Sequence, residues 1–220
     1  MRLIAFPGVF APISDSRLLA ACLRRELRPG AHVADVCTGS GLLAVTAALH
    51  GAAAVSATDR SRRAVLSARI NARLNGVTVR ARRGDLLEPL RGKRFDLIVS
   101  NPPYVPAETE ALPSRGVARA WDAGRNGRAV IDRLCDEAPA HLRPGGMLLL
   151  VHSTICGENA TRERLEQNGL QTDVVARRRG ALGPILAQRA HTLEARGMLA
   201  PGEREEEIIV IRARVAENAR

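Results

Sequence analysis

The chain is short of aromatic side chains: its 220 residues include three phenylalanines, one tyrosine and one tryptophan. Proteins that bind flipped bases or single-stranded nucleic acid use aromatic rings as stacking surfaces, so this scarcity disfavours both classes. No apolar run approaches the ~20 residues that span a bilayer. Residues 1–7 are too short and too early interrupted by proline to form a secretory signal. We therefore expect a cytoplasmic protein without membrane contact.

Cysteine is also scarce. The four cysteines, Cys22, Cys37, Cys135 and Cys156, are widely spaced and include no Cys-x-x-Cys pair. This spacing argues against a metal site and against a disulfide framework. We expect a reducing compartment and a site without metal.

Carboxylates are outnumbered, because 23 Asp and Glu face 33 Lys and Arg, which gives a net charge of +10. Such an excess is typical of proteins that bind nucleic acid. All basic residues except Lys93 are arginine, however, and alanine is abundant, a pattern that genome composition alone produces. The arginines are dispersed, with short clusters at residues 60–63, 80–83 and 177–179. Two interpretations stay open: a surface that faces a polyanion, and a compositional bias.

Apolar periodicity and turn residues predict alternating strands and helices. Strands are expected at residues 32–37, 55–59, 77–82, 95–100, 147–152, 172–176 and 208–211. Helices are expected at residues 14–27, 41–50, 61–74, 129–142 and 158–168, with a turn at 143–146 and a largely helical insertion at 182–203. This order predicts an α/β fold with a doubly wound, mostly parallel seven-stranded sheet and an antiparallel edge strand. We expect residues 1–220 to form one domain, in which residues 1–30 are an N-terminal segment and helix.

The expected crossovers bring together two turns that are far apart in sequence. Right-handed connections place the first and fourth strands side by side at the switch point of the sheet. The turn Gly39-Ser40-Gly41 and the tetrapeptide Asn101-Pro102-Pro103-Tyr104 then lie on opposite lips of one crevice. In open α/β sheets, ligands bind in such a crevice.

The tetrapeptide Asn101–Tyr104 follows a buried strand and contains the only tyrosine. Its prolines lack backbone donors, but their carbonyls stay free to accept. The Asn101 side-chain oxygen and the Pro102 carbonyl can therefore hold both hydrogens of a planar NH2 group, while Tyr104 lies against its face. This geometry suits methyl transfer to an amide or to an exocyclic base amine. The simpler alternative is a turn that ends the strand. No general base is evident, and we expect His152, at the end of the fifth strand, to be structural.

Three acidic residues, Asp35, Asp59 and Asp85, end three successive predicted strands. Glycines after Asp35 let the backbone approach a ligand, and the next helix begins with free N–H groups that favour an anion. Asp59 can bind both ribose hydroxyls, and Asp85 can accept from an adenine amine beside the Leu86 backbone. A pyrophosphate gains nothing from so many carboxylates, so the pattern predicts an adenosine that carries a positive centre. The alternative for Asp59 and Asp85 is helix N-capping.

These segments resemble the class I S-adenosylmethionine-dependent methyltransferases, whose sheet is Rossmann-like, and within them the HemK-like N5-glutamine methyltransferases that modify release factors. Residues 35–41 are similar to the family's cofactor motif, and residues 101–104 to its catalytic motif. Residues 10–16 resemble the N-terminal segment of the short branch, which lacks the extra helical domain. Residues 120–127 resemble the loop that closes over the substrate. Ala11 and Ser14 replace two family glutamates, and Cys37 stands where glycine is common.

The resemblance implies a role for each matching residue. S-adenosyl-L-methionine is expected to contact Ser16, Asp35, Thr38, Gly39, Gly41, Asp59, Asp85, Leu86 and Asn101. Catalysis is expected from Asn101, Pro102 and Tyr104. The substrate is expected to contact Pro103, Tyr104, Trp121 and Gly124, with Gly124 and Gly127 making the loop mobile.

The resemblance also implies the reaction, which is methylation of a glutamine side-chain amide in a protein such as a release factor, on or near the ribosome. Members of the short branch work with a small zinc-binding activator subunit, so we consider one as a partner. Three alternatives stay open: an adenine or guanine exocyclic amine as acceptor, a small-molecule amine or amide, and a scaffold that binds cofactor without catalysis. The loop after Trp121 favours the protein substrate over nucleic acid, and the intact tetrapeptide disfavours the scaffold.

Overall fold

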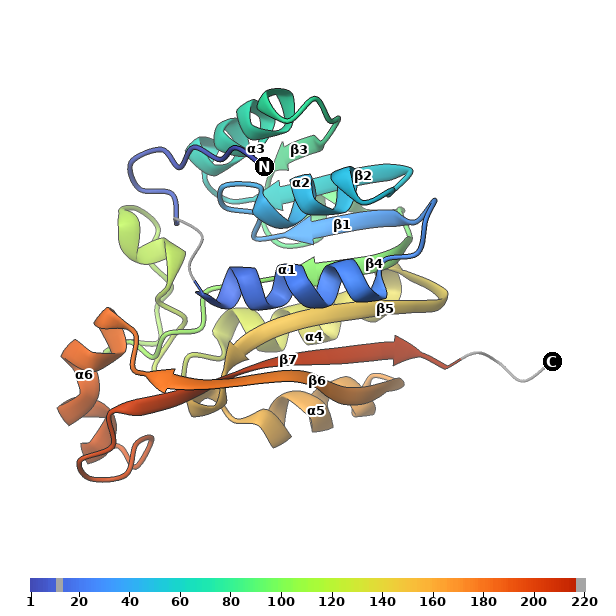
Figure 1. The fold of residues 1–220 in the computed structure, drawn as a ribbon. Helices are drawn as coiled ribbons and strands as arrows, with labels where there is room; N and C mark the ends of the chain where they lie inside the picture. The colour runs from blue at the N-terminus through green and yellow to red at the C-terminus, as the bar shows by residue number, and fades with distance from the viewer. Residues whose placement is uncertain (11–13, 217–220) are drawn as a thin grey trace.

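The chain folds around a seven-stranded sheet in the order β3-β2-β1-β4-β5-β7-β6 (Figure 1). This computed structural model describes residues 1–10 and 14–216, so residues 11–13 of the N-terminal segment lie outside the described part. The strands are β1 His32–Val36, β2 Ala54–Asp59, β3 Arg80–Arg83, β4 Phe95–Ser100, β5 Leu142–Ser153, β6 Leu170–Ala181 and β7 Glu205–Val215. The helices are α1 Ser14–Glu26, α2 Leu42–Leu49, α3 Arg62–Leu74, α4 Ala129–Glu137, α5 Glu158–Gln167 and α6 Pro184–Ala195. Short 3₁₀ helices are η1 Glu88–Leu90, η2 Val117–Ala120, η3 Ala138–His141 and η4 Thr154–Cys156.

Helices cover both faces of the sheet. Helices α1, α2 and α3 pack on one face, and α4 and α5 on the other (Figure 1). Successive side chains of a strand point to opposite faces, so one strand serves both layers. In β5, Leu148 and Leu150 pack toward α4 and α5, whereas Leu149 and Val151 pack toward α1 and α2. The predicted doubly wound fold is therefore confirmed.

The switch point lies where the sequence predicts it. Strand β1 pairs in parallel with β2 on one side and with β4 on the other, and Val36 lies opposite Ser100. The residues that follow, Cys37 and Asn101, therefore leave the sheet side by side. The sheet also ends in the predicted antiparallel pairing, because β7 runs antiparallel to both β5 and the outermost strand β6. The hairpin formed by β6 and β7 pairs with β5 through β7, which leaves β6 as the edge strand.

The strands of the C-terminal half are longer than predicted. The expected turn at 143–146 lies inside β5 as a bulge, because Leu142 pairs with Phe95 and Met147 with Leu97. The β6–β7 hairpin spans residues 170–181 and 205–215, and its tip extends beyond β5, whose pairing with β7 stops at Ser153. Ion pairs of 2.8 Å and 2.7 Å across this tip join Arg177 to Glu207 and Arg179 to Glu205.

Two segments fold over the carboxyl end of the sheet. Helix α6 lies in the segment that was predicted to be largely helical, and it buries Leu186, Ala190 and Leu193 in a small separate cluster. Residues 1–10 run along α3, where the Asn71 side chain bonds to the backbone of Ile4 at 2.8 Å. Within residues 1–10 and 14–216, no helix has both the length and the apolar character needed to cross a membrane.

Candidate active site

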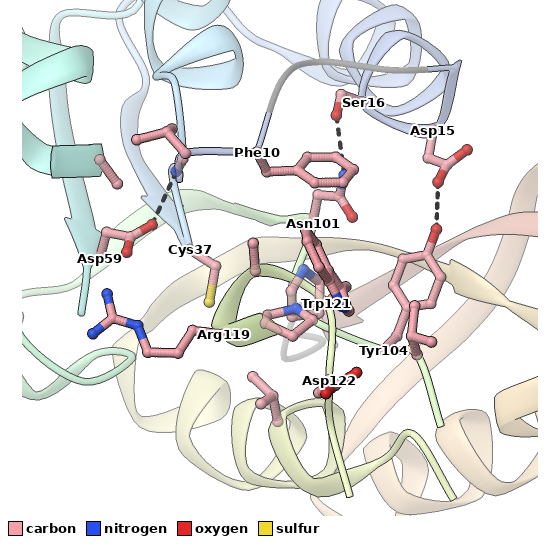
Figure 2. Close-up of a pocket in the computed structure, with 18 of the residues that line it drawn as sticks. Phe10, Asp15, Ser16, Cys37, Asp59, Asn101, Tyr104, Arg119, Trp121 and Asp122 are labelled. Atoms are coloured by element: carbon pink, nitrogen blue, oxygen red, sulfur yellow. Dashed lines mark hydrogen bonds between the residues drawn. The ribbon is translucent and has the colours of Figure 1, made fainter. Parts of the chain in front are cut away.

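A cavity of about 430 Å³ opens at the carboxyl ends of β1, β2, β3 and β4. This volume lies within the ~300–1,000 Å³ typical of small-molecule sites. Of the residues predicted from the sequence, Ser16, Thr38, Gly39, Asp59, Asp85, Leu86, Asn101, Pro102, Pro103, Tyr104 and Trp121 line it. Three others, Asp35, Gly41 and Gly124, are not among the lining residues. The glycine turn and the tetrapeptide thus meet in one cavity (Figure 2).

Asp35 holds the glycine turn from inside the protein. Its side chain is fully buried, and its Oδ2 accepts hydrogen bonds from the Thr38 hydroxyl at 2.6 Å and from the Ala44 N–H at 2.9 Å. Its Oδ1 is buried and has no partner among the described residues. Burial raises the pKa of Asp35 to about 7 in spite of these two hydrogen bonds. We expected Asp35 to contact the ligand, but no part of its carboxylate is exposed. Its role in this structure is to hold the glycine turn.

The two glycines of the turn serve different purposes, although both have positive φ, 53° at Gly39 and 85° at Gly41. A Cβ on Gly41 would lie 2.8 Å from the Ala68 Cα, so this glycine lets α2 approach α3. A Cβ on Gly39 would meet only the Phe10 carbonyl oxygen, at 3.9 Å. Gly39 therefore presents open backbone to the cavity, and Gly41 is required for packing.

We expect Gly41→Ala to destabilise the fold by roughly 2–4 kcal/mol, because it combines a backbone clash with positive φ. Gly39→Ala should cost only about 1–2 kcal/mol, the penalty for positive φ alone, but should weaken binding of an adenosine ligand. Urea denaturation and ligand titration of both variants test this difference. Equal losses of stability would contradict the packing role of Gly41.

Asp59 and Asp85 lie at the ends of β2 and β3. Asp59 accepts hydrogen bonds from the Gly39 N–H at 3.0 Å and from the Ser61 N–H at 2.8 Å. Burial raises the pKa of Asp59, and these bonds only partly oppose it. The N-cap of α3 is Ser61, so capping does not account for Asp59. Asp85 is 36% exposed and pairs with Arg133 of α4 at 3.0 Å.

Cys37 departs from the preferred backbone geometry, with a φ of 61°. Its thiol lines the cavity, and burial, followed by the Asp59 charge, raises its pKa well above the ordinary value. Left-handed backbone costs an L-residue roughly 1–2 kcal/mol and glycine almost nothing. Glycine would therefore avoid a strain that cysteine bears at this position.

For the same reason we expect Cys37→Gly to be more stable than Cys37→Ala by about 1 kcal/mol, although alanine is usually the more stable of the two. Both variants lack the thiol, so the difference in stability between them does not include the effect of its loss. Urea midpoints at constant slope measure the difference. The opposite order would show that the φ of residue 37 carries no strain.

The first turn of α1 holds both polar side chains of the tetrapeptide. The Asn101 Nδ2 donates to the Ser16 Oγ at 3.0 Å, and no described residue donates to the Asn101 Oδ1. The Tyr104 hydroxyl donates to Asp15 (Figure 2). Asp15 also accepts from Arg178 of β6 at 3.0 Å. Burial, followed by the Asp15 charge, raises the pKa of Tyr104 well above its ordinary value, so the phenol stays neutral. Ser16 thus orients Asn101, a contact that the sequence did not predict.

Parts of the loop after the tetrapeptide pack closely against their neighbours. Trp121 lines the cavity, and its carbonyl accepts from the Val105 N–H at 2.7 Å. A Cβ on Gly127 would collide with the Tyr104 carbonyl oxygen, and one on Gly124 would lie 3.0 Å from the Glu110 Oε2. Both glycines therefore fit the loop to its neighbours, and Gly124 lies behind the cavity wall instead of facing a substrate.

His152 has the structural role that we expect of it. It is fully buried and does not line the cavity. Burial lowers its pKa to about 4, so the ring is neutral near pH 7. It is therefore no candidate for a general base.

Sequence reasoning missed several cavity residues, namely Phe10, Asp15, Arg119, Arg178 and Glu206. Arg178 and Glu206 come from the β6–β7 hairpin, more than 70 positions after the tetrapeptide, so no local pattern connects them with it. Asp15 could have been predicted to lie at the cavity, because it precedes Ser16, which the sequence already assigned to the site.

Comparison with known proteins gives a family match. The methyltransferase small domain family matches residues 1–120. A protein of Methanocaldococcus jannaschii, assigned as a protein N5-glutamine methyltransferase, is 33% identical over 177 residues, which are 80% of this chain and 88% of that protein. The release factor glutamine methyltransferase of Bordetella pertussis is 39% identical over 174 residues, which are 75% of this chain and 64% of that protein. The chain thus spans most of the archaeal relative and less than two thirds of the bacterial one.

A solved structure gives a fold match. The Mtq2–Trm112 complex of E. cuniculi, which is responsible for methylation of the termination factor eRF1, superposes with a TM-score of 0.65 at 23% identity. The match covers 95% of this chain and 99% of the other. At this identity the similarity shows the fold alone.

Proposed function

Because the chain belongs to the methyltransferase small domain family, and within it to the N5-glutamine methyltransferases, we propose that it methylates the side-chain amide of a protein glutamine with S-adenosyl-L-methionine as donor. One observation carries the proposal: a single cavity contains both the acidic strand ends Asp59 and Asp85 and the tetrapeptide that begins at Asn101. An adenosine ligand and an amide acceptor would meet there.

The residues of the cavity fit S-adenosyl-L-methionine. When bound, this compound supplies an electrophilic methyl group on a sulfonium centre. Asp59 can accept from ribose hydroxyls, because each of its oxygens uses one lone pair for the Gly39 or Ser61 N–H and keeps another. Asp85 can accept from the adenine amine with Oδ1, which lies 3.9 Å from the Arg60 Nε, because Oδ2 pairs with Arg133. Open backbone at Gly39 allows the close approach that such a ligand needs.

The tetrapeptide fits the amide of the substrate. An amide nitrogen is a poor nucleophile, because its lone pair is conjugated and the related rotation barrier is about 18–20 kcal/mol. The free Oδ1 of Asn101 and the Pro102 carbonyl can accept the two N–H bonds and stabilise charge as the nitrogen loses planarity. Ser16 keeps the Asn101 carboxamide in this orientation. Holding the two reactants in this alignment can lower the activation free energy of methyl transfer by roughly 7–11 kcal/mol. Tyr104, fixed by Asp15, supplies a neutral aromatic wall.

We infer that the protein substrate is a peptide-chain release factor, as in the name of the Bordetella relative. Release factors act in translation, which assigns the enzyme to the cytoplasm. The partner named in the Mtq2 complex suggests that a small activator subunit supports this chain as well.

Labelled-methyl transfer tests the proposal. Purified enzyme is incubated with methyl-labelled S-adenosyl-L-methionine and one of three acceptors: release factor, the same factor with its candidate glutamine replaced by alanine, or ribosomal RNA. We expect label on the first acceptor only, and mass spectrometry should locate it on a glutamine side chain. Label on RNA alone would overturn the protein substrate.

A further inference from the structure

We propose that the edge of the sheet formed by α3 and β3 is a docking surface for the phosphate backbone of structured RNA. Its basic edge consists of six exposed side chains: Arg62, Arg63, Arg73, Arg80, Arg82 and Arg83. This edge lies at the end of the sheet opposite β6 and α6 (Figure 1). The six arginines do not line the cavity, so docking there leaves the methyl-transfer site open.

The charge of the chain is unevenly distributed along the sequence. Residues 1–100 contain 16 Lys and Arg and 7 Asp and Glu, whereas residues 101–220 contain 17 and 16. The net charges are therefore +9 and +1. A compositional preference for arginine would act on both halves alike, and the numbers of basic residues are indeed nearly equal. Only the number of carboxylates differs, so composition does not explain the basic half.

Ion pairing shows the same asymmetry. Among the described residues, 12 basic side chains from residues 101–220 form ion pairs with carboxylates. From residues 1–100 one does, Arg60 with Asp85 at 3.9 Å. None of the six arginines of the basic edge forms an ion pair with a carboxylate in the described part of the chain. Uncompensated like charges repel one another and attract a polyanion.

The chemistry of the edge favours phosphate over an acidic protein. Arginine binds phosphate through two parallel N–H donors. Helix α3 has 13 residues and is therefore about 20 Å long, enough to face several phosphates of a duplex. A partner strand would need the open carbonyls of β3, but Arg69 already donates two hydrogen bonds to the Ala81 carbonyl, at 3.1 Å and 2.6 Å.

The kind of nucleic acid follows from two further points. Single-stranded nucleic acid needs aromatic stacking surfaces, and the edge has none, which favours a base-paired stem. The choice of RNA over DNA rests on the proposed function, because a substrate that acts in translation meets its enzyme close to RNA. Contacts to phosphate position a protein without reading sequence, so we expect little sequence preference.

Fluorescence anisotropy tests the docking surface. The probe is a labelled RNA hairpin with a stem of about 16 base pairs, titrated with full-length enzyme between about 50 and 200 mM salt. The test variant is Arg73→Ala/Arg80→Ala/Arg82→Ala. The control variant, Arg162→Ala/Arg179→Ala/Arg204→Ala, loses the same net charge from positions whose side chains are 38% to 68% exposed and have carboxylate partners. A DNA duplex of equal length and an acidic peptide are competitors.

We expect the test variant to lose roughly tenfold or more in RNA affinity and about three units of salt slope, one for each phosphate contact. The control should change by less than about threefold. Equal losses in both variants, or no binding of RNA by the unaltered enzyme, would overturn the proposal. Competition by the acidic peptide alone would assign the edge to a protein that also covers the exposed Leu66 and Leu74. Methyl transfer to free release factor is measured separately, so its absence beside intact RNA binding would refute only the proposed function.

Discussion

The variant Asn101→Ala should lose methyl transfer by roughly 10³-fold or more while it still binds S-adenosyl-L-methionine. The loss has two physical causes. Removing one preorganised polar group that stabilises developing charge costs about 10²–10³-fold, and a substrate displaced by about 1 Å loses roughly 10²-fold more. Single-turnover rates and isothermal titration with the cofactor measure the two properties independently.

Ser100→Ala is the matched control for this variant. Ser100 precedes Asn101 on β4 and is buried, and its hydroxyl donates to the Val36 carbonyl at 2.7 Å without lining the cavity. Its loss should cost about 1 kcal/mol of stability and leave the rate of methyl transfer unchanged. Retained turnover in Asn101→Ala, or equal loss in both variants, would refute the role of Asn101.

Asp35 should make the protein less stable as the pH rises from about 4 to about 7. Its folded-state pKa is raised from 3.8 to about 7, chiefly by burial. Between these values the folded state binds more protons than the unfolded state, so stability falls with rising pH. A pKa shift of this size corresponds to a decrease of up to about 4 kcal/mol in the free energy of unfolding. Asp35→Asn should flatten this part of the stability curve, which urea denaturation at several pH values would show.

Asp96 gives a control of opposite sign. Burial opposes its ionisation, but hydrogen bonds from the His32 N–H and the Arg143 guanidinium outweigh burial, and its pKa is lowered. The ionised Asp96 carboxylate therefore stabilises the folded state above its ordinary pKa, and this stabilisation is lost when the pH falls. In Asp96→Asn, the free energy of unfolding should no longer decrease for this reason on acidification. If Asp35→Asn leaves the slope between pH 4 and 7 unchanged, this carboxyl is not the group that titrates there.

The sequence contains enough information to predict the sheet and the meeting of the two turns. Alternating strands and helices have few right-handed arrangements, so the neighbours β1 and β4 follow from the order of elements alone. The ends of the strands are marked by polar residues after apolar runs, as at Asp59 and Asn101. These signals are local, and the structure confirms the fold that they predict.

Other features could not be predicted, because they depend on contacts between distant segments. The β6–β7 hairpin extends through charged residues, whose cross-strand pairs Arg177–Glu207 and Arg179–Glu205 form only after the strands align. The burial of Asp35 and the packing of Gly41 against α3 depend on tertiary geometry, which a glycine motif does not reveal. The bond from Tyr104 to Asp15 joins residues 89 positions apart.

A crystal structure with S-adenosyl-L-methionine and a glutamine peptide tests the central claim most directly. The amide nitrogen should lie about 3 Å from the Asn101 Oδ1 and about 3–3.5 Å from the methyl carbon, so oxygen and carbon should be within roughly 6.5 Å of one another. A larger separation that leaves no place for the nitrogen between them, or a cofactor bound away from Asp59, would contradict this account.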